Sequence, residues 1–136
     1  MRVWIYSRLS NDDDCEMNSL LNQQEICRAF AERQGHQVIG QSSDDNASGM
    51  NFSRRGLDEL TAAVDAGRLD AVLIKDLSRL GRHRTQTALF IDYLRERGVR
   101  VISVTEGLDT ASDEDDLVIG VRGLMNDYYA RDIGKK

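Results

Sequence analysis

Three polar side chains alternate at the end of the mostly apolar opening run MRVWIYSRLS. Alternate residues of an extended chain share one face, so Tyr6, Arg8 and Ser10 are expected to point the same way. A serine hydroxyl is a weak nucleophile until a base or a cation stabilises its alkoxide, and Arg8 can supply that charge. The same spacing also fits a serine that caps a turn.

A second group of candidates lies in KDLSRLGRHR, residues 75–84. Arg79 and Arg82 are three residues apart, and Gly81 between them lets the backbone turn. Two guanidinium groups near one point can bind a phosphate through paired hydrogen bonds. Phosphoryl transfer needs such binding, because its catalysis is mainly positioning and electrostatic stabilisation. A solvated basic turn before a helix fits the same residues.

A further arginine, Arg54, stands at the start of a predicted helix. A helix N-terminus already favours an anion, so Arg54 could add another positive group to a phosphate site. Taken alone, it also fits an ordinary surface arginine.

The elements that must position these residues alternate along the chain. The apolar patterns predict strands at 2–8, 36–41, 70–75 and 99–104, and helices at 18–34, 54–66 and 85–97. Ser53 is expected to cap the second helix, and the polar residues 42–53 are expected to form a loop. A last helix is expected from about 113 to the end. This order predicts an α/β fold, a mostly parallel sheet of four or five strands with helices on both faces and a long C-terminal helix.

The candidate residues gather at the predicted strand ends. Ligands of such sheets bind at the carboxyl ends of the strands. These ends are followed by YSRLS, DDNASG, KDLSRLGRHR and TEGLDT, and three of the four carry Ser, Arg or Lys. The topology therefore predicts the site independently of any single motif.

Composition narrows the function classes. The 136 residues suffice for one domain with a core, and the formal net charge is −5. That balance argues against sequence-independent DNA binding by the whole domain, but a local basic site remains compatible with it. No apolar run is long enough to cross a membrane. The two cysteines, Cys15 and Cys27, lack metal-ligand spacing and favour a reducing compartment, so a cytoplasmic location is expected.

Five short motifs follow one another along the chain. They are Y-x-R-x-S at 6–10, S-L-x-x-Q at 19–23, D-x-x-S-G at 45–49, R-x-G-L at 54–57 and S-R-L-G-R at 78–82. Together they resemble the catalytic domain of the serine recombinases, the resolvase/invertase family, over essentially the whole chain. The closing NDYYARDIGKK looks most like the large serine recombinases of conjugative transposons and related mobile elements.

The resemblance implies a role for each matching residue. Ser10 matches the nucleophile that attacks a DNA phosphodiester and leaves a 5′-phosphoserine link and a 3′-hydroxyl. The residues that match phosphate-binding arginines are Arg8, Arg54, Arg79 and Arg82, and those that match supporting positions are Tyr6, Gln23, Asp45 and Ser48. Family members need no metal or nucleotide cofactor. They exchange strands within a tetramer by subunit rotation and rejoin DNA without ATP.

One position departs from the family pattern. Many members have Asp directly before the first Arg of the D-R-L-x-R motif, where this chain has Ser78. The nearest carboxylate is Asp76, two residues earlier. We hypothesise that Asp76 takes over a proton-carrying role, if the loop turns it inward.

The resemblance also predicts domains and partners. Residues 1–112 are expected to form the catalytic core, and 113–136 the start of a long interface helix, with the family's DNA-binding domain absent from this chain. The expected partners are double-stranded DNA and further copies of the chain, as a dimer or tetramer, with no membrane. The C-terminal helix would provide the contact between copies through an apolar stripe of Leu117, Val121, Leu124, Met125 and Tyr128.

Two other interpretations stay open. A non-catalytic phosphate-sensing or oligomerisation module of receiver-like α/β type would use Asp12, Asp13 and Asp14 as an acidic pocket and Asp76 as acceptor, but TEGLDT offers no lysine for it. The second alternative is a family member that has a regulatory role and does not cut DNA. The intact Ser10 speaks against it, and Ser78 speaks for it.

Overall fold

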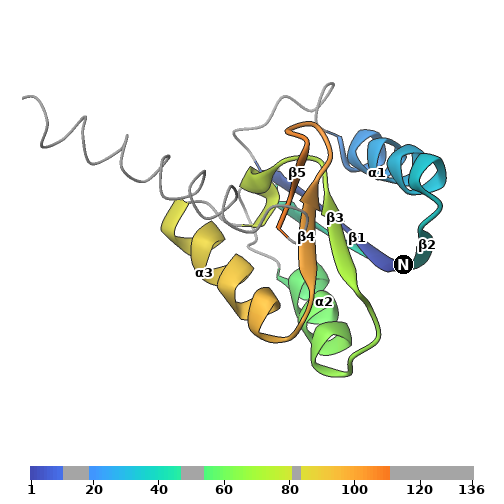
Figure 1. The fold of residues 1–136 in the computed structure, drawn as a ribbon. Helices are drawn as coiled ribbons and strands as arrows, with labels where there is room; N and C mark the ends of the chain where they lie inside the picture. The colour runs from blue at the N-terminus through green and yellow to red at the C-terminus, as the bar shows by residue number, and fades with distance from the viewer. Residues whose placement is uncertain (11–18, 47–53, 81–83, 111–136) are drawn as a thin grey trace, which may run out of the picture.

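The computed structural model describes residues 1–10, 19–46, 54–80 and 84–110, which form one sheet with helices on both faces (Figure 1). The strands are β1 (Arg2–Ser10), β2 (Gln37–Asn46), β3 (Ala71–Ile74), β4 (Arg100–Ser103) and β5 (Leu108–Asp109). The helices are α1 (Leu20–Gln34), α2 (Arg55–Asp65) and α3 (Arg84–Glu96), with the short 3₁₀ helix η1 (Leu77–Leu80) after β3.

The sheet has the order β2-β1-β3-β4-β5. The pairs β1–β2, β1–β3 and β3–β4 are parallel, and β5 runs antiparallel to β4. All four residues of β3 are buried, as the unbroken apolar run AVLI predicts for a central parallel strand. The predicted mostly parallel α/β fold is confirmed.

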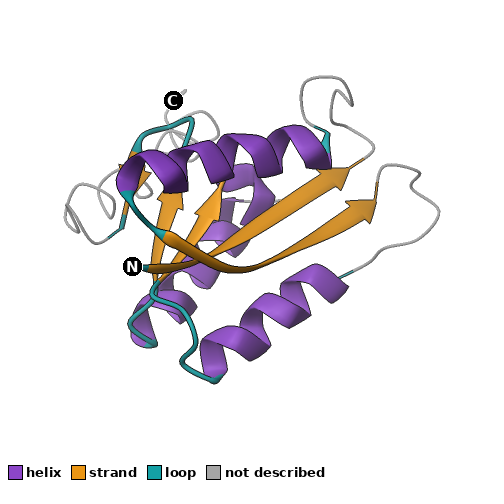
Figure 2. Cartoon of the chain, turned by 90° about the vertical axis from the view of Figure 1, so that its right-hand side faces the viewer, coloured by secondary structure: helices purple, strands orange, loops and turns teal. Residues whose placement is uncertain are grey.

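Alternation along β1 divides the core into two layers. Trp4 and Tyr6 pack on the α2 and α3 side, with Leu60 and Leu94. Val3 and Ile5 pack on the α1 side, in the smaller cluster that includes Cys27 and Ala31. Figure 2 shows α1 and α2 on opposite sides of the sheet. The Arg8 side chain, two residues after Tyr6, therefore belongs to the α2 and α3 side.

The structure corrects the predicted end of β2. We expected the strand to end at residue 41, but it continues to Asn46, and Tyr6 to Ser10 pair in register with Ser42 to Asn46. The Ser42 hydroxyl accepts from Trp4 Nε1 at 2.9 Å and donates to the Gly56 carbonyl at 2.7 Å. Residues 42–46 were assigned to a loop because they are polar, yet Ser42 and Asp44 are buried and hydrogen-bonded inside the fold. The rest of that loop, 47–53, lies outside the described residues.

The helix ends follow the expected chemistry in α1 but not in α2. Ser19 caps α1 by accepting from the Asn22 N–H at 3.1 Å, and Gly35 ends it in the left-handed conformation at φ 72°. The N-cap of α2 is Arg54, which makes no side-chain capping bond, so the expected cap at Ser53 is wrong. The Asp44 carboxylate of β2 caps this helix instead.

Among the residues that the structure describes, no helix is both long enough and apolar enough to cross a membrane. The predicted helix from 113 and its apolar stripe fall outside the described residues, so the division at 112 stays a prediction.

Candidate active site

The polar side chains of interest lie at the carboxyl end of β1. Two arginines link this end to η1 by a reciprocal exchange. The Arg8 guanidinium donates to the Ser78 carbonyl at 2.5 Å, and the Arg79 guanidinium donates to the Arg8 carbonyl at 2.6 Å. Figure 1 shows η1 at the end of the sheet farther from the N-terminus. Residues 71 positions apart in sequence are thereby fixed side by side.

Gln23 of α1 binds the backbone of Arg8 from the other face of the sheet. Its side chain is fully buried, and its Oε1 accepts from the Arg8 N–H at 3.1 Å. Its Nε2 donates to the Arg8 carbonyl at 2.9 Å. A buried amide is stable only when its donors and acceptors are paired, so Gln23 fixes the backbone that carries Arg8.

The η1 loop has an internal carboxylate. Asp76 Oδ1 lies 3.3 Å from Arg79 Nε and accepts from the Ser78 N–H at 3.1 Å. The Ser78 hydroxyl also donates to Asp76. The Arg79 side chain is only 6% exposed, so this ion pair holds its guanidinium in a sheltered place. Ser78 and Asp76 thus form one hydrogen-bonded unit at the base of η1.

Tyr6 and Asp44 connect β1 with β2 and α2. The Tyr6 hydroxyl donates to Asp44 at 2.7 Å, and both groups are buried. The same carboxylate accepts from the Gly56 N–H at 2.8 Å and the Leu57 N–H at 3.1 Å. These are N–H groups of the first turn of α2, which Asp44 therefore caps from a neighbouring strand.

Two arginines act on the pKa of Tyr6. Burial is the main cause that raises the pKa of Tyr6 above its ordinary value, followed by the hydrogen bond to Asp44 and the charge of Asp44. The positive charges of Arg8 and Arg54 act in the opposite direction and lower this pKa. Both guanidinium groups are therefore close enough to act on the phenol, which stays protonated near neutral pH.

A glycine allows α2 to approach β2. A Cβ on Gly56 would lie 2.5 Å from the Ser43 carbonyl oxygen. The backbones of helix and strand would have to separate to admit any side chain. Glycine at this position lets Asp44 reach the helix N-terminus and brings Arg54 to the site.

The structure joins four predicted site residues, Arg8, Gln23, Asp76 and Arg79, in one hydrogen-bonded group. A fifth, Tyr6, lies two residues before Arg8 on β1 and bonds to Asp44. Arg54 is exposed at the N-cap of α2, and its charge acts on Tyr6. Asp45 is exposed on β2.

Three predicted residues are described in part or not at all. Ser10 is the last residue of β1 and pairs with Asn46, but its side chain is outside the described part, as are Ser48 and Arg82.

Sequence reasoning missed Asp44. Asp45 was chosen because it begins D-x-x-S-G, whereas the hydrogen bonds to Tyr6 and α2 belong to its neighbour. Extending the alternation of β2 by a few residues would have found it, since Ser42 and Asp44 then share the face that looks toward α2.

The candidate site is rich in hydrogen-bond donors. Arg8, Arg54 and Arg79 offer positive charge at one end of the sheet, and Asp44 and Asp76 hold the scaffold around it. Such an arrangement suits an oxyanion such as a phosphodiester. Within the described ranges, no three His, Cys, Asp or Glu side chains cluster in a way that could hold a metal.

Comparisons with known proteins agree with this fold. The family described as "Resolvase, N terminal domain" matches residues 3–136, and the chain belongs to this family. The Tn3 transposon resolvase of Escherichia coli is 35% identical over 77 residues. The DNA-invertase of Escherichia phage P1 is 29% identical over 82 residues. These matches cover 57% and 60% of this chain but only 40% and 43% of those relatives.

Two solved structures resemble nearly the whole chain. The N-terminal catalytic domain of TP901-1 integrase has a TM-score of 0.75 at 25% identity, covering 96% of this chain and 98% of that one. A resolvase family site-specific recombinase from Streptococcus pneumoniae has a TM-score of 0.79 at 25% identity, covering 98% and 90%. These likenesses support a serine recombinase catalytic domain.

Proposed function

We propose that this chain is the catalytic part of a site-specific DNA recombinase in which Ser10 attacks a DNA phosphodiester. The observation that carries the proposal is the reciprocal link between Arg8 and Arg79. It holds two guanidinium groups at the end of the strand on which Ser10 lies. Positive groups in such a position stabilise the charge that develops on a phosphoryl group during transfer.

The proposed step balances as a transesterification. The Ser10 oxygen forms a bond to phosphorus while the bond from phosphorus to the 3′ oxygen breaks. Ser10 gives up a proton and the departing 3′ oxygen gains one, leaving a 3′-hydroxyl and a 5′-phosphoserine link. The link keeps the bond energy, so a 3′-hydroxyl can reverse the step without a nucleotide or a metal.

Tyr6 carries another hydroxyl near the arginines, and its surroundings argue against it as the nucleophile. Its proton is donated to a buried carboxylate, and burial raises the pKa of its phenol. A phenol held in this way supports the site but does not readily form the attacking oxyanion.

Asp76 is proposed to carry a proton in this reaction, in place of the family carboxylate that Ser78 replaces. Its contacts with Ser78 and Arg79 put it on the loop that holds Arg79. An unchanged cleavage rate in Asp76→Ala would contradict this part of the proposal.

The wider activity is proposed from the family. The partners are double-stranded DNA at recombination sites and further copies of the chain, in a dimer or tetramer formed through the helix expected after 112. Strand exchange and rejoining follow within the tetramer, in the cytoplasm.

Covalent trapping tests the proposal. The protein expressed from the complete reading frame is mixed with labelled DNA from the ends of its element, in the presence of a chelator. We expect a denaturation-resistant protein–DNA band that is absent in Ser10→Ala. Specific DNA binding without this band would instead favour a regulatory relative that does not cut.

Arginine variants in the same assay test the phosphate site. Arg8→Ala and Arg79→Ala are each expected to slow formation of the band by roughly 100- to 1,000-fold, because each removes a charge-assisted contact. Arg2→Ala is the matched control, since this exposed arginine lies at the opposite end of β1 and pairs with Asp70 at 3.2 Å. Losses of only a few-fold at both site arginines would show that the phosphate binds elsewhere.

A further inference from the structure

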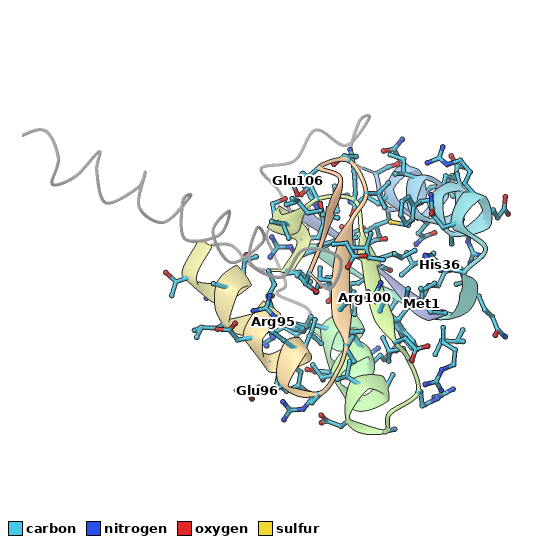
Figure 3. All side chains as sticks on the ribbon, viewed as in Figure 1. Met1, His36, Arg95, Glu96, Arg100 and Glu106 are labelled. Carbon is cyan, nitrogen blue, oxygen red and sulfur yellow. The ribbon has the colours of Figure 1, made fainter. Side chains whose placement is uncertain are left out.

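Glu106 belongs to the strand-end stretch TEGLDT but lies outside the five family motifs, and it contacts the loop that carries Arg79. It follows β4 on the turn that leads to β5, and Figure 3 shows it at the end of the sheet where η1 lies. Its Oε1 accepts from the Leu77 N–H at 2.8 Å and from the Ser103 hydroxyl at 2.5 Å. Leu77 is the first residue of η1.

We propose that Glu106 is a positioning residue for DNA cleavage, which sets the place of η1 and through it the two arginines of the site. This inference rests on the proposed function. The first N–H groups of a helix have no partner within it, and a side-chain oxygen that accepts from them fixes where the helix begins. For η1, that oxygen is Oε1 of Glu106, which lies on the turn between β4 and β5.

The whole turn before Glu106 is attached to the exit of β3. The Val104 N–H donates to the Ile74 carbonyl at 2.9 Å. Both the N–H and the hydroxyl of Thr105 donate to the Lys75 carbonyl, at 3.0 and 2.6 Å. The backbone of this turn therefore follows β3 residue by residue, and Glu106 makes the next contact, at Leu77. These contacts fix the position of Glu106 as a hydrogen-bond acceptor.

The effect reaches the arginines through a short path. Ser78 and Arg79 directly follow Leu77, and they make the reciprocal contacts with Arg8. A shift of η1 would move the Ser78 carbonyl away from the Arg8 guanidinium and the Arg79 guanidinium away from the Arg8 carbonyl. Small misplacements of this kind can cost on the order of 100-fold in rate.

The two hydrogen bonds to Glu106 allow a positioning role to be distinguished from a role in proton transfer. Both hydrogen bonds end on the same oxygen of Glu106, so the amide oxygen of glutamine can accept both of them. Positioning predicts that Glu106→Gln cleaves DNA close to the wild-type rate, whereas Glu106→Ala is about 100-fold slower with unchanged DNA affinity. Equal losses in both variants would overturn positioning and indicate acid–base chemistry. Glu59→Ala, an exposed position on α2, is the control for removing a glutamate.

A second readout needs neither DNA nor activity. Amide hydrogen exchange at Leu77, resolved by nuclear magnetic resonance, should be slow in the wild type and in Glu106→Gln and faster in Glu106→Ala. Unchanged exchange in Glu106→Ala would overturn the inference, even if cleavage fell. Failure of the wild type to form a covalent DNA link would overturn the proposed function, while the exchange result would still report whether Glu106 fixes η1.

Discussion

Two tyrosine–aspartate hydrogen bonds in this molecule have the same length and very different surroundings. Tyr6 donates to Asp44 at 2.7 Å, and Tyr93 donates to Asp65 at 2.7 Å. Asp44 is 2% exposed, whereas the side chain of Asp65 is 60% exposed. Length alone therefore says little about what either bond does.

The two aspartates also differ in what they connect. Asp44 joins three elements, because its other partners are N–H groups at the start of α2. Asp65 is the last residue of α2, and it accepts from Tyr93 of α3 and from Arg97. The Arg97 guanidinium lies 3.8 Å from the centre of the Tyr93 ring. The first bond is part of the scaffold of the candidate site, and the second is a contact between helix surfaces.

The largest difference is expected when each carboxylate is removed. Asp44→Ala leaves the Tyr6 hydroxyl and the two α2 N–H groups without their acceptor inside the protein. Buried unpaired donors are costly, so we expect a loss of about 3 kcal/mol in the free energy of unfolding. Asp65→Ala should lose much less, because water can replace an exposed partner.

Urea unfolding of both variants beside the wild type measures this difference. Asp44→Asn is a useful intermediate, since it keeps one acceptor oxygen and should lose less than Asp44→Ala. Similar losses for Asp44→Ala and Asp65→Ala would contradict the distinction between scaffold and surface.

A smaller effect is expected at alkaline pH. The pKa values of Tyr6 and Tyr93 are both raised above 10.0, in each case mainly by burial and then by the bonded aspartate. Above pH 10 the unfolded chain releases a tyrosine proton that the folded chain keeps. The stability from Tyr6 is therefore complete below pH 10 and falls above it, by about 1.4 kcal/mol per pH unit.

Phenylalanine variants separate the two tyrosines. Tyr6→Phe should flatten the fall of unfolding free energy between neutral pH and about pH 11, and Tyr93→Phe should flatten it less. Urea unfolding at several pH values provides the measurement. A larger flattening in Tyr93→Phe would mean that the pKa of the partly buried Tyr93 is the more perturbed of the two.

The same contrast explains how much the sequence could predict. The alternation of predicted strands and helices was sufficient for the mostly parallel sheet with helices on both faces. The end of β2 was missed because residues 42–46 are polar, yet Ser42 and Asp44 are buried through their contacts with β1 and α2. Asp44 was missed for the same reason, since the groups that donate to it, from Tyr6, Gly56 and Leu57, belong to two other elements.

Glu106 shows a different limit of sequence reasoning. It stands in a turn with no periodicity, and its partner Leu77 is 29 residues away. Its contact with η1 depends on how the exits of β3 and β4 run beside each other, which no spacing in the sequence reports. The arginines, by contrast, were found because they follow strands whose carboxyl ends must meet.

The most direct test of the account is to identify the residue that becomes joined to DNA. Trypsin cleaves after Arg2, Arg8 and Arg28, so Tyr6 falls in the peptide of residues 3–8 and Ser10 in the peptide of residues 9–28. After the trapped complex is digested with nuclease and trypsin, mass spectrometry should find a 5′-phosphonucleotide on Ser10. A nucleotide on residues 3–8, or on another residue of the second peptide, would contradict the account.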